Sequence, residues 1–309
     1  MNILTLGGSG FVGRTICAML VAQGDTVTVL TRRREHAHAL SSLPGVTIDE
    51  GVDLFAGDAL TARLRGHDAV INLVGILHGD FQRSHVTLTE RVIAACEGAG
   101  VRRYLHMSAL GADAQGPSEY QRSKGRAEAL VRGAGLDSTV FAPSVIFGRD
   151  DRFLNQFANM VALLPPWMPM LLPGGYASFQ PVWVNDVARA FVCALREPAS
   201  IGQRYELVGP ARYTLAELVR YVVTLSGTRH AVVGLPRAAT ALAGALLQFA
   251  PGKPMTPDNV KSMSVDNVSS APWPAFAGDR AALETVVPSW LGRAAAYDRL
   301  ADVRRRARH

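Results

Sequence analysis

A glycine-rich turn near the start of the chain constrains the fold more than any other feature of the sequence. An apolar run, Asn2 to Leu6, leads directly into Gly7-Gly8-Ser9-Gly10-Phe11-Val12-Gly13, and residues 14–23 continue with the apolar spacing of a helix. In such a strand–turn–helix unit the first glycine permits a tight turn, the second lets the backbone approach a pyrophosphate, and the third lets the helix pack closely on the strand. The sequence therefore predicts a dinucleotide site at the helix N-terminus; a glycine turn that serves only as a loop is the alternative.

Strand and helix patterns alternate along the first half of the chain. This alternation predicts an α/β fold, a Rossmann-type doubly wound parallel sheet. We expect residues 1–150 to form an NAD(P)-binding domain, with residues 177–200 returning to its sheet as a strand and a helix. Residues 151–176 and 201–309 are expected to form a smaller, discontinuous C-terminal domain for substrate or partner. The expected strands are 2–6, 26–30, 46–54, 69–75, 101–107, 140–142 and 182–184, and the helix after the last of these is expected to be capped by Asn185 or Asp186.

The amino-acid composition excludes a disordered chain, and the distribution of charge argues against a nucleic-acid groove. Hydrophobic residues make up 48% of the sequence and charged residues 19%, which is typical of a folded protein. The formal net charge is +6, but residues 299–309 hold five arginines against one aspartate, so little positive charge is left elsewhere. We expect this tail to be either a solvated terminus or a contact for an acidic partner or anionic headgroups.

The cysteines, the histidines and the lengths of the apolar runs indicate where the protein is located and whether it binds a metal. The three cysteines lie far apart in apolar helical patterns, so we expect buried thiols. Met1 leads straight into the first strand without room for a signal peptide, and no stretch reaches about eighteen uninterrupted apolar residues. We therefore expect a cytoplasmic protein. We expect no metal site, because the eight histidines lack H-x-x-x-H spacing.

The segment after the second strand bears on the choice of nicotinamide nucleotide. An NAD-specific protein usually presents an acidic residue there to the ribose hydroxyls, whereas this chain has Thr31-Arg32-Arg33-Arg34. Arginine at this point suits a 2′-phosphate, so we expect NADP(H) to be preferred over NAD(H), with Arg32 first and Arg33 second as its ligands. A solvated charge run after a strand is the alternative.

Three other strand ends are expected to border the nucleotide. The third strand ends at Asp53 and Leu54, from which a carboxylate and a backbone amide can reach adenine, with Asp58 as a rival. The fourth strand ends at Gly75, which opens a loop beside the cofactor. The sixth strand is followed by a segment that passes near the nicotinamide, and its expected contact residues are Pro143, Val145 and Ile146.

The candidates for chemistry are Ser108, Tyr120 and Lys124. Ser108 follows the fifth strand at its C-terminal end, where open α/β sheets place their ligands. Tyr120 and Lys124 are four residues apart in a predicted helix, so they stack on one helix face. A phenol with a pKa of about 10 is a poor base at neutral pH unless a nearby cation favours the phenolate, and Lys124 supplies that cation. Lys124 can also hold the nicotinamide ribose, while Ser108 donates a hydrogen bond to a substrate carbonyl.

Taken together, the glycine turn, Ser108, Tyr120 and Lys124 resemble the short-chain dehydrogenase/reductase superfamily in its extended or atypical branch, the epimerase/dehydratase-like proteins. The resemblance implies that Tyr120 is the general acid/base, that Lys124 holds the ribose and lowers the phenol pKa, and that Ser108 orients the substrate. It also implies cofactor contacts from two further segments: Asp53 and Leu54 at adenine, and Leu73, Val74 and Gly75 beneath the nicotinamide-side ribose.

A narrower resemblance rests on residues 106–112, 143–155 and 179–187. These segments are similar to the NADPH-carrying accessory subunit of respiratory complex I and its bacterial relatives. That resemblance implies a tightly held NADPH, a structural use of it, and peripheral association with a quinone-linked respiratory complex at the inner face of the membrane. Because this chain keeps Ser108, Tyr120 and Lys124, the non-catalytic role of the respiratory subunit cannot be carried over to it directly.

Two functions therefore compete. The first is an NADP(H)-dependent oxidoreductase or epimerase/dehydratase-like enzyme that transfers hydride to or from a carbonyl or alcohol of a small-molecule substrate. The second is a catalytically idle, NADPH-stabilised accessory or assembly protein of a respiratory membrane complex.

The C-terminal half is expected to carry substrate or partner contacts. Residues 161–176 are too proline-broken for a helix and too apolar for an ordinary loop, so they form a pocket wall, a membrane- or partner-facing patch, or core. Thr214 to Leu225 predicts a helix with a capping box formed by Thr214 and Glu217. Residues 238–250 predict a nearly apolar helix, buried or at an interface. Residues 251–277, rich in Pro, Asn and Ser, suggest no function.

Overall fold

The chain folds into two compact units built from separate stretches of sequence. The computed structural model describes residues 1–51, 53–55, 58–165, 167–248 and 255–291. The first unit comprises Met1–Pro143, Val184–Leu207 and Ser270–Asp279. The second comprises Ser144–Trp183, Val208–Ser269 and the described residues from Arg280 on.

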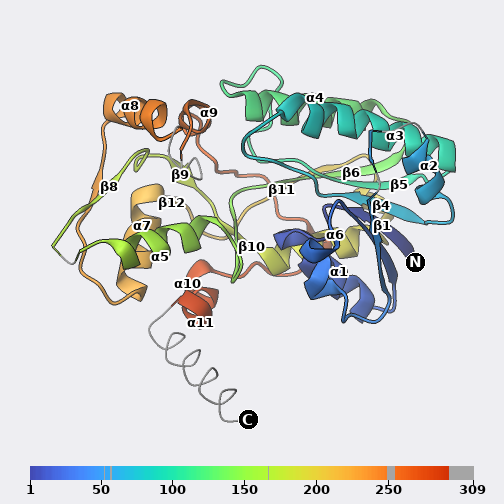
Figure 1. Cartoon of the computed structure of the whole chain (residues 1–309), viewed down its shortest axis with the longest axis horizontal. Helices are drawn as coiled ribbons and strands as arrows, with labels where there is room; N and C mark the ends of the chain where they lie inside the picture. The colour runs from blue at the N-terminus through green and yellow to red at the C-terminus, as the bar shows by residue number, and fades with distance from the viewer. Residues whose placement is uncertain (52, 56–57, 166, 249–254, 292–309) are drawn as a thin grey trace, which may run out of the picture. The chain divides into compact units, whose positions relative to one another are not determined.

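The first unit contains a seven-stranded parallel sheet, as a doubly wound α/β fold requires (Figure 1). The strand order is β11-β6-β5-β4-β1-β2-β3, so the chain winds outward in both directions from β1. In such sheets ligands bind outside the carboxyl ends of the strands, at the point where the winding reverses. The strands are β1 Asn2–Leu6, β2 Thr26–Thr31, β3 Val46–Glu50, β4 Ala69–Asn72, β5 Arg103–Met107, β6 Asp137–Pro143 and β11 Arg204–Leu207.

Helices cover both faces of this sheet. Helices α1 and α6 pack together, and α2, α3 and α4 form a second layer (Figure 1). The strands between the two layers are almost wholly buried, and all four residues of β4 are inaccessible to solvent, which explains their apolar sequence. The helices are α1 Phe11–Ala22, α2 Ala59–Leu64, α3 Leu88–Ala99, α4 Glu119–Gly133 and α6 Val184–Ala194. The shorter helices are the 3₁₀ helices η1 Arg34–Leu40, η3 Pro198–Ser200 and η4 Ala275–Ala277 and the π-helix η2 Gln82–Thr87.

Three local predictions in this unit are wrong. The third strand ends at Glu50 rather than Leu54, because Gly51 takes a left-handed conformation with φ of 78° and turns the chain. The strand at Val182–Trp183, β10, pairs with β7 and not with the large sheet. Helix α6 begins at Val184, so neither Asn185 nor Asp186 precedes it as a cap; Asp186 lies buried in the first turn.

The seventh strand of the sheet comes from a segment for which no strand was expected. Strand β11 lies at the sheet edge beside β6, with Arg204 opposite Val140 and Leu207 opposite Pro143. Arg204 also forms ion pairs with Glu128 of α4 and with Glu206. Strand β11 is held by its pairing with β6, which is distant in the sequence. Its four residues have mixed polarity and therefore show no local pattern typical of a strand.

The second unit is made of short helices and three two-stranded sheets. Helix α7 Leu215–Leu225 begins with the predicted capping box: the Glu217 amide donates to Thr214 Oγ1, and the Thr214 amide donates to Glu217. The other helices are α5 Phe153–Leu163, α8 Arg237–Leu247, α9 Pro257–Ser262, α10 Leu283–Val286 and α11 Pro288–Leu291. The paired strands are β7 Ile146–Phe147 with β10 Val182–Trp183, β9 Ser178–Phe179 with β12 Tyr213–Thr214, and β8 Met170–Leu172 with β13 Val232–Gly234.

The proline-rich stretch 161–176 is more ordered than its sequence suggested. Its first three residues complete α5, and β8 lies within it. The helix expected at 238–250, buried or at an interface, runs over Arg237–Leu247 and is largely exposed. It is therefore not buried, and a place at an interface stays a prediction. Residues 249–254, which include part of the Pro-, Asn- and Ser-rich stretch, and the arginine-rich tail lie outside the described residues. Among the helices that the structure describes, none combines the length and apolarity needed to cross a bilayer.

Candidate nucleotide and catalytic site

The glycine turn lies between β1 and α1 at the reversal point of the sheet. Gly7 has φ of 78°, and a Cβ atom there would lie 3.1 Å from the carbonyl carbon of Leu73. A Cβ atom on Gly13 would lie 2.4 Å from the Gly7 carbonyl oxygen, so only glycine lets α1 begin this close to the turn. Gly10 occupies the cap position of α1 without a side-chain hydrogen bond, which leaves the first amides of the helix, including those of Phe11 and Val12, oriented for a diphosphate.

The glycine cradle therefore fits a dinucleotide phosphate on geometric grounds. The remaining members of the turn support its shape: Gly8 packs on the Thr5 side chain, where a Cβ atom would lie 2.3 Å from Oγ1, and Ser9 is partly exposed beside it. Gly8 tolerates little change, because a Cβ atom there would meet the side chains of Thr5 and Val29.

The predicted 2′-phosphate ligands lie at the carboxyl end of β2, next to β1. Leu6 is paired with Leu30, so Arg32 and Arg33 follow the strand directly beside the glycine turn. Both arginines are exposed. The Thr31 hydroxyl donates to the Arg33 carbonyl at 2.9 Å, which holds the backbone of this short run in place.

The adenine-side residues lie beyond the shortened third strand. Asp53 is exposed, and its Oδ1 accepts the amide of Phe55 at 2.9 Å. Leu54 is half-buried against the core of the first unit. The Arg83 guanidinium lies 4.3 Å from the centre of the Phe55 ring, a contact that spacing along the chain did not suggest. The rival Asp58 is exposed and does not cap α2 with its side chain.

The loop after β4 is held from both sides. The Leu73 amide donates to the Leu6 carbonyl at 2.9 Å, and the Val74 amide donates to Asn72 Oδ1 at 3.1 Å. A Cβ atom on Gly75 would lie 3.3 Å from Lys124 Nζ. This loop, expected to pass beneath the nicotinamide-side ribose, is thus in direct contact with the predicted catalytic lysine.

Lys124 is buried and bound by backbone oxygens of two strand ends. Its Nζ donates to the carbonyl of Val74 at 3.3 Å and to that of Met107 at 3.0 Å. Burial lowers the pKa of Lys124 to about 8, although Glu128 acts in the opposite direction. The ammonium is therefore fixed between the loop after β4 and the end of β5, at the carboxyl edge of the sheet.

Ser108 occupies the first position after β5, where the sequence placed it. Its amide donates to the Phe141 carbonyl at 2.7 Å. Its Oγ is buried and has no hydrogen-bond partner within the described ranges of the chain. A buried hydroxyl without a partner is costly, which fits a group whose partner is a ligand.

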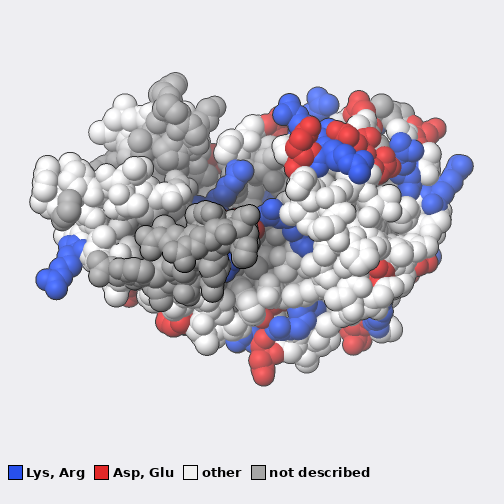
Figure 2. All heavy atoms as spheres, turned by 60° about the horizontal axis from the view of Figure 1, so that its bottom comes forward, with Lys and Arg blue, Asp and Glu red and all other residues white. Residues whose placement is uncertain are grey.

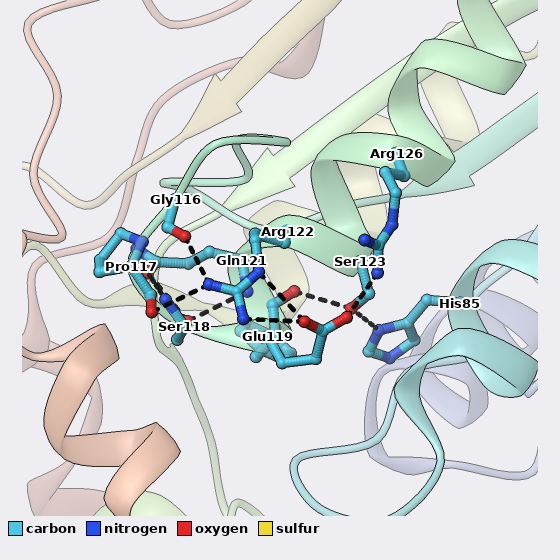
Figure 3. A network of polar contacts seen from close by, with 10 residues as sticks. His85, Gly116, Pro117, Ser118, Glu119, Gln121, Arg122, Ser123 and Arg126 are labelled. Carbon is cyan, nitrogen blue, oxygen red and sulfur yellow. Dashed lines mark hydrogen bonds and ion pairs between the residues drawn. The ribbon is translucent and has the colours of Figure 1, made fainter.

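Tyr120 lies one turn before Lys124 on α4. The helix begins with a capping box formed by Ser118 and Gln121, and Glu119 binds two arginines of the next turns (Figure 3). Burial raises the pKa of Tyr120 to about 12. The expectation that Lys124 lowers the phenol pKa is therefore wrong for this structure, because removal of the ring from water outweighs any benefit from the buried ammonium.

His85 is a further member of the site that the sequence did not reveal. It lies in the η2 turn, and its ring packs edge-on against Tyr120 with centroids 5.8 Å apart. Its Nε2 accepts the amide of Ile76 at 3.1 Å, so its Nδ1 carries the proton and donates to Ser123 Oγ at 2.8 Å (Figure 3). Ser123 in turn donates to the Tyr120 carbonyl at 2.9 Å. His85 thus links the cofactor loop to the helix that carries Tyr120.

The other predicted contacts are divided between the two units. Pro143 ends β6 in the first unit, and its carbonyl accepts the Leu110 amide at 2.8 Å. Val145 and Ile146 belong to the second unit, where both lie at the start of the β7–β10 pairing. In the part of the chain that the structure describes, no three His, Cys, Asp or Glu side chains gather as metal ligands.

Known proteins are similar to this chain in sequence or in fold. A family model described as NAD(P)H-binding matches residues 7–153. The mitochondrial NADH dehydrogenase (ubiquinone) 1 alpha subcomplex subunit 9 of Mus musculus is 31% identical over 279 residues, which cover 87% of this chain and 73% of the relative. The ceramide reductase of Caulobacter vibrioides is 27% identical over 246 residues, which cover 78% of this chain and 75% of the relative.

A solved structure confirms the fold class independently. The nucleoside-diphosphate-sugar epimerase of Staphylococcus aureus superposes with a TM-score of 0.65 at 21% identity, covering 85% of this chain and 88% of the epimerase. At 21% identity the similarity is evidence for the fold alone. Together with the family match, it establishes an NAD(P)H-binding domain of the Rossmann type.

Proposed function

This chain belongs to the extended short-chain dehydrogenases/reductases, in the group that includes subunit 9 of the NADH dehydrogenase 1 alpha subcomplex, and on that premise we propose that it uses NADPH to reduce the carbonyl group of a lipid-like substrate. The observation that carries the proposal is the arrangement of Ser108, Tyr120 and Lys124 around the carboxyl ends of β4 and β5. Bound NADPH would supply the hydride. The chain's own residues would bind the cofactor, orient the substrate and protonate the carbonyl oxygen.

Tyr120 is suited to act as an acid. With a pKa of about 12 its phenol is protonated at neutral pH and can give its proton to the carbonyl oxygen as hydride reaches the carbon. The product is an alcohol, and the phenolate left behind recovers a proton from solvent. By microscopic reversibility the same residue would act as the base if the reaction ran as an oxidation.

Ser108 and Lys124 act as positioning groups in this scheme. The unpartnered Ser108 hydroxyl can donate to the same carbonyl oxygen and hold it toward Tyr120. Lys124, already fixed by two carbonyl oxygens, has a third donor position for a ribose hydroxyl. Both groups are set in place before ligand binds, which reduces the ordering that binding requires.

NADPH is proposed over NADH because of Arg32 and Arg33. The two guanidinium groups follow the strand that usually carries an acidic residue in NAD-specific proteins, and both are exposed beside the glycine turn. A lipid-like substrate is proposed because a relative covered over 75% of its length is named for reducing a ceramide, and because the second unit carries a long uncharged stretch, residues 153–183.

The experiment is NADPH oxidation by the purified full chain with carbonyl substrates that carry a long acyl or prenyl chain. Tyr120→Phe should lower kcat/KM by about a hundredfold or more, because a general acid contributes that much, while the Kd for NADPH stays within about twofold. Tyr205→Phe, which removes a phenol hydroxyl outside the site, is the matched control. Equal activity of Tyr120→Phe and wild type would remove Tyr120 from the mechanism.

A second candidate function is an idle, NADPH-stabilised accessory role in a respiratory membrane complex. It is favoured by the 31% identity to a subunit of NADH dehydrogenase. In that case the chain should co-purify with subunits of a membrane complex, carry NADPH that no carbonyl substrate oxidises, and tolerate Tyr120→Phe without loss of association. Turnover with any lipid-like carbonyl would count against it.

A further inference from the structure

Large apolar side chains are unusually exposed in the second unit. Soluble proteins rarely expose contiguous apolar patches without a binding role. Within the described residues, the second unit holds nine of the twelve large apolar side chains that are most exposed. The nine are Met160, Leu163, Trp167, Leu171, Tyr176, Val233, Leu242, Leu246 and Val265, with Leu163 85% and Trp167 79% exposed.

Most of these side chains lie on segments that are bonded to one another. Leu171 of β8 is paired with Val233 of β13, so the two exposed side chains are direct neighbours. The His230 ring is hydrogen-bonded at 3.0 Å to the carbonyl of Met168, next to Trp167. The exposed segments that we call the apolar surface are therefore the end of α5, the loop to β8, the β8–β13 pair and α8.

Helix α8 is tied to the same region. The Gly174 amide, just beyond β8, donates to Thr240 Oγ1 of α8 at 3.0 Å. Arg237, the first residue of α8, has its guanidinium 5.4 Å from the centre of the Tyr176 ring. Leu242 and Leu246 are one turn apart on α8 and both are more than 60% exposed.

Basic side chains predominate along the apolar surface, although Asp258 of α9, which packs on α8, and Asp266, next to Val265, are acidic. Residues 153–185 contain no charged side chain, and residues 218–257 contain no acidic one. The described cations of the second stretch, Arg220, Arg229 and Arg237, are all exposed. On the face drawn in Figure 2 the described side chains of the second unit are mostly white, whereas those of the first unit include many of both signs.

From this combination we infer that the apolar surface docks on an anionic lipid bilayer. Exposed leucines with a tryptophan and a tyrosine suit the boundary between headgroups and acyl chains, where aromatic rings with one polar end are favoured. The arginines along the apolar surface complement anionic headgroups. The inference needs no turnover and stands apart from the proposed reaction.

The test is co-sedimentation of the full chain with vesicles of phosphatidylcholine and phosphatidylglycerol. Wild type should bind, and Leu163→Ser combined with Leu171→Ser should weaken the partition by about tenfold or more, because both leucines are exposed and their loss does not disturb the core. Ile201→Ser, at an exposed apolar residue of the first unit, is the matched control and should bind as wild type does.

Two further measurements separate the sources of binding. Arg229→Gln should weaken binding to the anionic vesicles and leave the weaker binding to pure phosphatidylcholine unchanged, since it removes only a charge. Tryptophan emission of the wild type should shift to the blue on vesicle addition, and Trp167→Phe should lose that shift. The NADPH Kd measured on the same samples reports on the nucleotide site separately, so failure of the docking and failure of the proposed function are distinguishable.

The inference is overturned if wild type binds neither vesicle, or if the double leucine variant binds as well as Ile201→Ser. It is also overturned if sedimentation shows a stable dimer that the leucine variant dissolves while neither protein binds vesicles. That result would assign the apolar surface to a second copy of the chain.

Discussion

Lowering the pH from 7 to 5 should destabilise the protein through His85. The ring is 2% exposed and its Nε2 accepts a backbone amide, so the neutral form is the one the fold accommodates. Burial, with help from the charge of Lys124, lowers the pKa of His85 to about 3. The unfolded chain therefore takes up a proton first as the pH falls, and stability present above about pH 6.5 is lost progressively toward pH 3.

The size of the effect follows from the distance between the pH and the ordinary histidine pKa. At pH 5, about 1.5 below the value of an unfolded histidine, the cost is about 2 kcal/mol, since each pH unit contributes about 1.4 kcal/mol. His106, which is also 2% exposed, acts in the same direction, because burial and the charges of Lys124 and His85 hold its pKa well below the ordinary value. The loss in the wild type should therefore exceed the share of His85 alone.

The assay is urea unfolding at pH 7 and pH 5 for the wild type and His85→Gln. The variant should lose about 2 kcal/mol less between the two pH values than the wild type does, whatever its stability at pH 7. His78→Gln, at an exposed histidine, is the control for the substitution itself. Identical pH dependence in wild type and His85→Gln would refute the claim that this histidine is held neutral.

Other perturbations test the turn, the cofactor preference and the buried ammonium. Gly13→Ala places a Cβ atom 2.4 Å from a carbonyl oxygen, so it should lower the free energy of unfolding by about 3 kcal/mol or more and weaken NADPH binding. Gly133→Ala, at the end of α4, meets nothing within 4 Å and should be neutral or slightly stabilising in thermal unfolding. Similar losses for both variants would show that the close approach at Gly13 is not real. Arg32→Ala should weaken NADPH about tenfold and NADH hardly at all in titrations, and equal weakening would argue against a 2′-phosphate contact. Because burial lowers the pKa of Lys124 to about 8, the unfolded chain holds more protons than the folded one between about pH 8 and 10, and the free energy of unfolding should rise with pH there. Lys124→Met should lack that rise. A rise that persists in the variant would show that another group ionises.

The parts of the fold that local rules govern could be predicted from the sequence. The glycine turn, the strand before it and the capping box of α7 depend on residues a few positions apart, and the structure confirms each. The four-residue spacing of Tyr120 and Lys124 also placed them on one helix. The doubly wound sheet followed because alternating strand and helix patterns leave few other topologies.

Contacts between distant segments decided the rest. Strand β11 joins the sheet, and β10 does not, because of partners far away in the sequence. Lys124 donates hydrogen bonds to the loop after β4 and to the end of β5, and the ring of His85 packs against Tyr120 from a segment 35 positions earlier in the chain. Spacing shows which side chains share a face, but not how deeply they are buried. Burial sets the free energy of a charge, and so only the tertiary structure showed that the phenol of Tyr120 is held protonated.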